Sequence, residues 1–166
     1  MKVVNSNKVE SNQGEEMTFL EFDLGSESYG VKLLAVKEVI TVPETTPLPN
    51  GPSYFKGIMN LRGQIISIVD LRKKLGIKSK DTVDEEAVVI MDFDGVSIGL
   101  IVDSINKVLN FNLSELVEIP EVQSQVNSRF IHGVYRGEEK LTLVLDLAKI
   151  FNLNEIKEMT QTQQAA

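Results

Sequence analysis

Asp70 and Asp146 carry the strongest catalytic hypothesis that this sequence offers. Each aspartate ends an apolar run in one of two similar blocks. Two related blocks that each supply one carboxylate could share a proton, as in aspartic proteases. In those enzymes Thr or Ser and then Gly follow the aspartate, whereas Leu71 and Leu147 follow here. Helix capping accounts for both positions without any chemistry, so we predict that Asp70 and Asp146 are N-caps.

The residue types that bind metals or act as nucleophiles are scarce. The chain has no cysteine, which excludes a disulfide scaffold, a thiolate zinc site and a cysteine nucleophile, and His132 is its only histidine. Gly57 and Gly63 superficially resemble a phosphate-binding loop, but Gln64 follows where such a loop needs Lys. We therefore expect no enzyme activity, no cofactor and no metal.

The composition is that of a soluble globular chain of one domain or two small ones, with 166 residues, 42% hydrophobic and 25% charged. The net charge is −7 and the only basic cluster lies at residues 72–80, so nucleic acid is not an expected partner. No apolar run approaches the length of a membrane span, and the N-terminus lacks the apolar core of a signal peptide. We expect a cytoplasmic protein without direct membrane insertion.

The elements that must position these residues come from an internal duplication. Gly30 and the apolar residues that follow it recur 69 residues later, from Gly99, without a gap. The block that begins at Gly57 recurs 76 residues later, from Gly133, so one insertion of seven residues reconciles the two offsets. Each half is too small to bury a generous core alone, so the halves must pack together and leave a groove between them.

The repeated pattern predicts an all-β fold. Alternating apolar residues predict two hairpins, of which the second joins Ala87–Phe93 to Val96–Val102. Each half then closes with a second hairpin-like pair around glycines, which runs into Asp70 or Asp146 and a helical turn. We expect two barrels of about five short strands, with short helical turns and a short C-terminal helix. How the two halves exchange strands is left open.

The segments around these strands set the expected domain boundaries. We expect a flexible arm at residues 1–16, one domain at 17–153 with repeats at about 17–76 and 87–153, and a polar tail at 154–166. Residues 33–40 and 105–109 fit a helical turn or a strand equally well, and residues 113–126 are expected to be partly helical.

One segment carries a resemblance to a known family. The run Gly57-Ile58-Met59-Asn60-Leu61-Arg62-Gly63, followed by Ile65, Val69, Asp70 and Leu71, resembles the signature of the CheW family of chemotaxis coupling proteins. Residues 19–40, with Tyr29-Gly30, Val36 and Glu38, and residues 99–109 are also similar to that family. The resemblance covers about Met17 to Leu153.

The resemblance implies two SH3-like β-barrel subdomains, no catalytic activity and a scaffold role. The expected partners are the regulatory domain of the histidine kinase CheA, at the first subdomain, and the cytoplasmic tip of methyl-accepting chemotaxis proteins, on the groove side. The protein would be a monomer outside the signalling array and would reach receptor arrays through its partners. The alternatives are a CheW-like module that serves a non-flagellar kinase pathway, and a small β-barrel enzyme or ligand-binding protein, which lacks a reactive constellation.

The candidate site residues lie around the signature. We expect partner binding at Val36, Glu38, Gly57, Arg62 and Gly63, and a structural motif at Asn60, Leu61, Asp70 and Asp146.

Arg62 itself admits two interpretations. It either lies in solvent at a turn or pairs with Glu38 and braces the segment around residues 36–40. Arg136, before Gly137, is its expected counterpart in the second half. Gly57, Gly63 and Gly137 are expected where a strand turns sharply.

Overall fold

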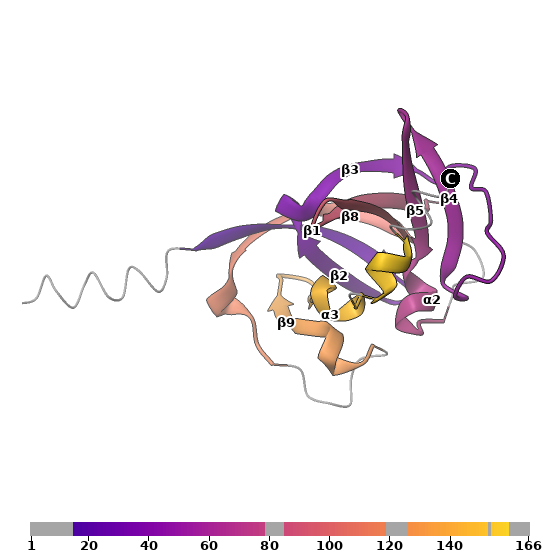
Figure 1. The fold of residues 1–166 in the computed structure, drawn as a ribbon. Helices are drawn as coiled ribbons and strands as arrows, with labels where there is room; N and C mark the ends of the chain where they lie inside the picture. The colour runs from indigo at the N-terminus through magenta and orange to yellow at the C-terminus, as the bar shows by residue number, and fades with distance from the viewer. Residues whose placement is uncertain (1–14, 79–84, 119–125, 153, 160–166) are drawn as a thin grey trace, which may run out of the picture.

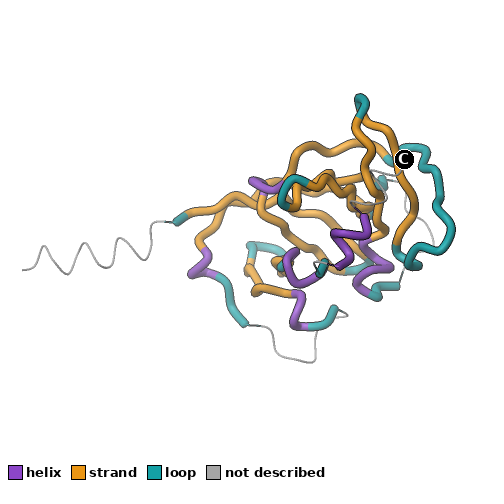
Figure 2. Tube along the Cα trace, viewed as in Figure 1, coloured by secondary structure: helices purple, strands orange, loops and turns teal. Residues whose placement is uncertain are grey.

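A computed structural model describes residues 15–78, 85–118, 126–152 and 154–159 of the chain. Strands dominate this part, and the helices are short (Figures 1 and 2). The strands form two five-stranded sheets, here called sheet A and sheet B. The predicted all-β class is therefore confirmed.

Sheet A has the order β8-β1-β2-β10-β9. Its strands are β8 (Ser104–Asn112), β1 (Glu16–Leu24), β2 (Glu27–Lys32), β10 (Leu141–Leu145) and β9 (Ile131–Arg136). Sheet B has the order β3-β6-β7-β5-β4. Its strands are β3 (Val36–Thr41), β6 (Ala87–Phe93), β7 (Val96–Val102), β5 (Gln64–Asp70) and β4 (Phe55–Leu61). Each sheet places two strands of one repeat beside three strands of the other.

The two repeats exchange strands reciprocally. The first hairpin, β1–β2, joins β8, β9 and β10 of the second repeat, and in Figure 1 the indigo β1 runs beside the salmon β8. Residues at equivalent places in the repeats occupy equivalent pairs, because Val144 faces Gly30 in the parallel pair β10–β2 while Ile68 faces Gly99 in β5–β7. This pairing answers the question that the sequence left open.

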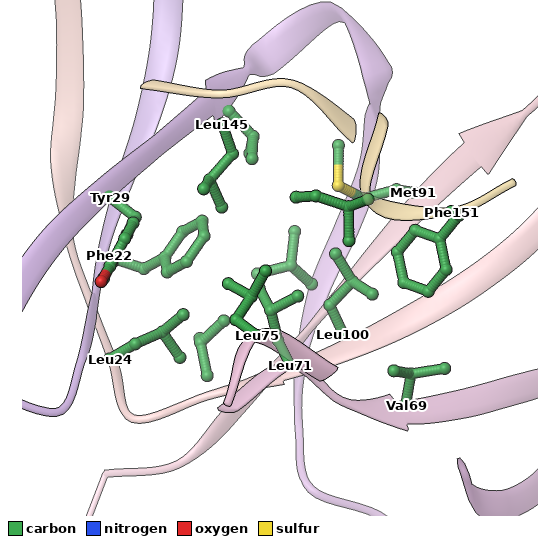
Figure 3. Packing of buried hydrophobic residues seen from close by; sticks show 14 of the residues in the cluster. Phe22, Leu24, Tyr29, Val69, Leu71, Leu75, Met91, Leu100, Leu145 and Phe151 are labelled. Carbon is green, nitrogen blue, oxygen red and sulfur yellow. The ribbon is translucent and has the colours of Figure 1, made fainter. Parts of the chain in front are cut away.

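The largest hydrophobic core lies between the sheets. Leu20, Phe22 and Leu24 of β1 contribute to it from sheet A, while Val89 and Met91 of β6 contribute from sheet B. Figure 3 shows side chains from both sheets around Leu71 and Leu75 of helix α2 (Leu71–Leu75). Alternate residues of the same strands point the other way, into two smaller cores. The central strands are thus buried on both faces.

The connecting segments resolve the ambiguous sequence patterns. Residues 33–40 form a short 3-10 turn, η1 (Leu33–Ala35), followed by β3, whereas residues 105–109 lie wholly within β8. Residues 113–126 contain η2 (Leu113–Glu115), and residues 119–125 lie outside the described part. Two further short elements, η3 (Ser128–Phe130) and α3 (Leu147–Ile150), flank β9 and β10.

The described part of the chain begins close to β1 and ends in a short helix. β1 already begins at Glu16, and the predicted arm otherwise falls on residues 1–14, outside the described part. Residues 154–159 form the short helix expected at the C-terminus. Met159 in this helix is only 6% exposed, because it packs into the core between the sheets. This portion of the predicted polar tail is therefore attached to the core, and residues 160–166 lie outside the described part.

Candidate partner-binding surface

The turn between β4 and β5 has a defined geometry. Arg62 and Gly63 both have positive φ angles, 53° and 86°, as the two central residues of a type I′ hairpin turn require. The flanking residues Leu61 and Gln64 pair with each other across the hairpin. The side-chain oxygen of Asn60 accepts a hydrogen bond from the Gly63 amide at 2.8 Å. Asn60 and Gly63 thus fix the direction in which Arg62 leaves the sheet.

Arg62 reaches from this turn to the opposite edge of sheet B. Its guanidinium donates two hydrogen bonds to the Glu38 carboxylate, from Nη1 to Oε2 at 2.9 Å and from Nη2 to Oε1 at 3.3 Å. Because Glu38 lies on β3 and the turn follows β4, the pair joins the two edge strands of the sheet. The predicted pairing is present. The Arg62 side chain is 76% exposed, so the pair organises the surface more than it stabilises the fold.

Gly57 lies near the start of β4, where the chain that follows β3 comes close to this strand. Its φ is +149°, and a Cβ at this position would collide with the backbone carbonyl of Thr46. The backbones of Thr46 and Ile58 exchange two hydrogen bonds there, at 2.8 and 3.0 Å. Gly57 therefore allows β4 to approach the chain that follows β3.

The strand β3 exposes a different set of side chains from the one predicted. Val36 and Glu38 are half-buried, and Val36 packs against the core between the sheets. Val39 is 42% exposed, and Leu34 in η1 is 96% exposed. The sequence analysis missed both apolar side chains, although strand alternation from Val36 would have pointed Val39 outward.

Asp70 is the N-cap that the sequence predicted. Its carboxylate accepts hydrogen bonds from the backbone amides of Arg72 and Lys73, at 3.1 and 3.4 Å, and α2 ends at Gly76 with a φ of 73°.

Asp146 also occupies the N-cap position of its helix, α3, but the predicted capping by its side chain is absent. Its side chain makes no capping hydrogen bond to α3, and its carboxylate lies 3.9 Å from Nζ of Lys149. In the first repeat Nε of Arg72 also holds Asp70, at 3.4 Å, whereas Ala148 occupies the position equivalent to Arg72. Nothing comparable orients Asp146. The two aspartates contact different cations, Asp70 the guanidinium of Arg72 and Asp146 the ammonium of Lys149.

Arg72 forms a buried ionic cluster that the sequence analysis did not identify. Its side chain is 9% exposed and contacts Asp70, Glu86 at 3.2 Å and Asp103 at 2.9 Å. The contact with Asp103 is an ion pair without well-aligned hydrogen-bond geometry at Oδ1, and the other oxygen of Asp103 accepts from the amide of Gly25 at 2.7 Å.

These contacts change the titration of Arg72 and join distant parts of the chain. Desolvation lowers the pKa of Arg72, but Asp70, Asp103 and Glu86 outweigh it, so the pKa lies above its ordinary value. The cluster connects helix α2, which follows β5 of sheet B, to the turn between β1 and β2 of sheet A. A comparison of Arg72 with Ala148 in the aligned repeats would have identified this position from sequence.

Arg136 is not the counterpart of Arg62. It is the last residue of β9 and lies opposite Leu141, at the position equivalent to Asn60. The following turn is closed by a hydrogen bond from the Gly137 amide to the Lys140 carbonyl at 3.0 Å, and Gly137 does not have the positive φ of Gly63. In the second repeat the positions of Glu38 and Arg62 are taken by Lys107 and Glu138, with the charges reversed.

Neither a metal site nor a membrane helix is found among the described residues. No group of three or more His, Asp or Glu side chains in this part could hold a metal ion. No helix here is long and apolar enough to cross a membrane.

Comparison with known proteins decides the family. The family model of the CheW-like domain matches residues 18–155. The chain belongs to the CheW-like family. A chemotaxis protein CheW of Treponema pallidum is 32% identical over 149 residues, which cover 87% of this chain and 88% of that protein. The crystal structure of the scaffolding protein TtCheW from Thermoanaerobacter tengcongensis superposes on this CheW-like chain with a TM-score of 0.75. The two are 28% identical, and the match covers 85% of this chain and 91% of that one.

The CheW-like fold also occurs within a longer protein. Chemotaxis protein CheV3 of Helicobacter pylori is 32% identical over 135 residues, and the match covers 76% of this chain but 43% of that protein. Sequence similarity is therefore spread over the whole CheW-like domain and is not confined to the signature around Arg62.

Proposed function

We propose that this CheW-like protein is a non-catalytic chemotaxis adaptor that couples chemoreceptors to the histidine kinase CheA. The observation that carries the proposal is the family match over residues 18–155, which spans both sheets. Relatives that match most of this chain are named chemotaxis protein CheW, and the similar solved structure is described as a scaffolding protein. An adaptor needs two surfaces that are occupied at the same time.

The first surface lies where the Arg62–Glu38 pair joins the two edge strands of sheet B. It is called the clasp surface below and is formed by Val36, Glu38, Gly57, Arg62 and Gly63. Its ion pair presents a fixed charge pattern, and the exposed Val39 and Leu34 on and beside β3 supply apolar contact area. Exposed apolar side chains beside ordered charges are typical of protein interfaces. We assign this surface to the regulatory domain of CheA.

Sheet A offers a related surface with different chemistry. Val108 is 50% exposed at the position equivalent to Val39, and Lys107 and Glu138 replace Glu38 and Arg62. Reversed charges at equivalent sequence positions favour two different partners over two copies of one partner. We infer that the second contact, with the cytoplasmic tip of a chemoreceptor, uses the side of the molecule where a cavity opens between the two sheets.

A reconstitution with purified components tests the proposal. The chain is mixed with the CheA regulatory domain and a cytoplasmic receptor fragment, and the complexes are separated by size-exclusion chromatography. We expect one complex that contains all three proteins. Arg62→Ala should weaken kinase-domain binding, while Arg136→Ala, an exposed arginine on sheet A, serves as the matched control. Failure of the chain to bind either fragment would refute the adaptor function.

A further inference from the structure

The loop between β3 and β4 contains a dipeptide that the adaptor function does not use. Asn50 and Gly51 form the only Asn-Gly pair in the sequence, and both residues are exposed. Pro49 and Asn50 lie in a turn, in which Asn50 has a φ of 68°. A type II turn requires a positive φ at its third residue and favours proline before it, and asparagine tolerates this backbone conformation. The turn therefore presents the side-chain amide of Asn50 to solvent directly before a glycine.

The two groups that could react with each other here are free. The side chain of Asn50 forms no hydrogen bond with any residue that the structure describes. The main-chain nitrogen of Gly51 likewise donates to no acceptor in the described part of the chain. Gly51 also has no Cβ that could crowd the approach of its nitrogen to Cγ of Asn50. Neither a hydrogen bond nor a side chain thus opposes a reaction between the two residues.

The other asparagines of the described part differ in both respects. Outside the C-terminal helix each of them uses its side chain in a hydrogen bond or a capping contact, namely Asn60, Asn106, Asn110, Asn112, Asn127 and Asn152. Asn154 lies in the C-terminal helix and precedes Glu155. None of these asparagines is followed by glycine. Among the described residues, only Asn50 combines a free side-chain amide with a glycine nitrogen beside it.

We propose that Asn50 is a site of spontaneous deamidation in the folded protein. The main-chain nitrogen of Gly51 attacks Cγ of Asn50, and the new C–N bond closes a succinimide ring. The bond between Cγ and Nδ2 breaks, and the proton of the Gly51 amide leaves with Nδ2 as ammonia. Water then opens the ring at either of its carbonyl groups, which yields aspartate or isoaspartate. Water is the only reactant that the protein does not itself supply.

The products would alter a loop that is attached to β4 at two places. Thr46 exchanges two main-chain hydrogen bonds with Ile58, and Phe55 packs against the core between the sheets. Gly51 lies close to the ring of Phe55, since a Cβ on Gly51 would come within 2.8 Å of Cδ1 of that ring. Both products add a negative charge to this loop, and isoaspartate also lengthens the main chain by one carbon. The modification therefore changes the chain directly before β4. The inference is independent of the adaptor function.

Peptide mapping of the purified full chain by mass spectrometry tests this inference. The protein is incubated in mildly alkaline buffer until a synthetic peptide of residues 46–55 in the same buffer has deamidated. We expect the Asn50 peptide of the folded chain to gain the mass of an amide-to-acid conversion and to separate into two isomers. Its rate should lie within about tenfold of the rate of the free peptide, a difference of about 1.4 kcal/mol in activation free energy. The rate should rise with hydroxide concentration, because the attacking nitrogen must lose its proton.

Two variants make the test specific. Asn50→Gln requires a larger ring and should slow the reaction at this position by at least about tenfold. Ser128→Gly is the matched control, because it places a glycine after Asn127, which is also exposed but whose side-chain oxygen accepts a hydrogen bond from the Arg129 amide. Asn127 in this variant should react at least about tenfold more slowly than Asn50.

Three results would overturn the proposal. They are a folded chain that stays unmodified while the peptide reacts, equal rates at Asn50 and at Asn127 of the Ser128→Gly variant, and an undiminished rate in Asn50→Gln. Failure of the adaptor function would appear in the reconstitution and would leave the peptide map unchanged.

Discussion

Nη1 of Arg72 lies 2.9 Å from Oδ1 of Asp103, and both side chains are almost completely buried. Asp103 stands between β7 and β8, where the chain crosses from sheet B to sheet A, and its amide donates to the carbonyl of Asp23 in β1. The ion pair therefore links α2 to the point at which the two sheets are joined. Their relative orientation therefore depends on a largely buried ion pair.

Removal of this guanidinium should be costly. Arg72→Met leaves Asp103 buried without its partner, and breaking a buried pair from one side destabilises a protein by about 3–5 kcal/mol. Lys73→Met, an exposed change on the same helix, is the control and should shift stability by less than about 0.5 kcal/mol. Urea unfolding of both variants measures the difference. Equal losses would show that the cluster does not hold the sheets together.

The two helix starts should respond differently to the same substitution. Asp70→Ala removes two capping hydrogen bonds and should cost about 1–2 kcal/mol of unfolding free energy, while Asp70→Asn should be nearly neutral. Asp146→Ala removes no cap and should cost about 0.5 kcal/mol or less. Thermal and urea unfolding compare the three variants. A similar cost at both positions would contradict the difference that the structure shows.

Substitution of the two clasp-surface glycines should distinguish the cost of backbone strain from the cost of a steric clash. Gly57→Ala places a methyl group against a backbone carbonyl that cannot move cheaply and should cost about 3 kcal/mol. Gly63→Ala meets only open space and should cost about 1 kcal/mol through its positive φ.

Gly95→Ala, in the equivalent type of turn on β6–β7, is the matched control. It should match Gly63→Ala in stability but leave kinase-domain binding unchanged. Equal effects of Gly63→Ala and Gly95→Ala on binding would exclude a role of the Arg62 turn.

Glu38 and Arg62 should act on partner binding as one unit. If each positions the other, the double variant Glu38→Ala with Arg62→Ala binds no worse than the poorer single variant, with a coupling energy of about 0.5–3 kcal/mol. Glu38→Ala combined with Lys73→Ala serves as the additive control. Titration of each variant against the kinase domain at one salt concentration gives the four affinities. Strictly additive losses at Glu38 and Arg62 would mean that the ion pair does not shape the surface.

The position of the C-terminal helix (residues 154–159) beside Tyr54 should be detectable in a tyrosine titration. Burial and the carboxylate of Glu155 raise the pKa of Tyr54 to about 12. The folded state therefore keeps this proton longer than an unfolded chain, whose tyrosine titrates near 10.0. The stability due to neutral Tyr54 is fully present below pH 10 and is lost as the pH rises towards 12.

Ultraviolet absorbance of the wild type minus Tyr54→Phe isolates this transition. Glu155→Gln should lower its midpoint, because it removes the nearby negative charge, while Glu138→Gln on a distant turn should not. An unchanged midpoint in Glu155→Gln would show that this helix does not lie against Tyr54 in solution.

The hairpins and the all-β class could be predicted because each depends on local signals, whereas the Glu38–Arg62 pair, which joins residues 24 apart, was only one of two interpretations. Alternation along a strand and a turn dipeptide specify a hairpin without reference to distant residues. The exchange of strands could not be predicted in this way. Both repeats carry the same pattern of apolar residues, so β1 could pair with β3 or with β8 without any change in which side chains are buried.

The errors at Asp146 and Arg136 have a common origin. Equivalence in the alignment of repeats was treated as equivalence of contacts, but a carboxylate caps a helix only when its surroundings orient it. Asp70 has Arg72 beside it and Asp146 has Ala148. The turn after Arg136 also lacks the positive φ angles that direct Arg62 towards Glu38. Both differences follow from single residues that the repeats do not share.

The exchange of strands has a consequence for how the chain is made. When the first 76 residues have left the ribosome, β1 and β2 still lack β8 and β10, and β5 still lacks β7. Neither sheet can close until the second repeat has emerged, since the pair β1–β8 joins residues as far apart as Glu16 and Asn112. Such long-range pairing slows folding and leaves strand edges exposed in the nascent chain. Early termination should therefore yield an aggregation-prone fragment rather than a smaller folded domain.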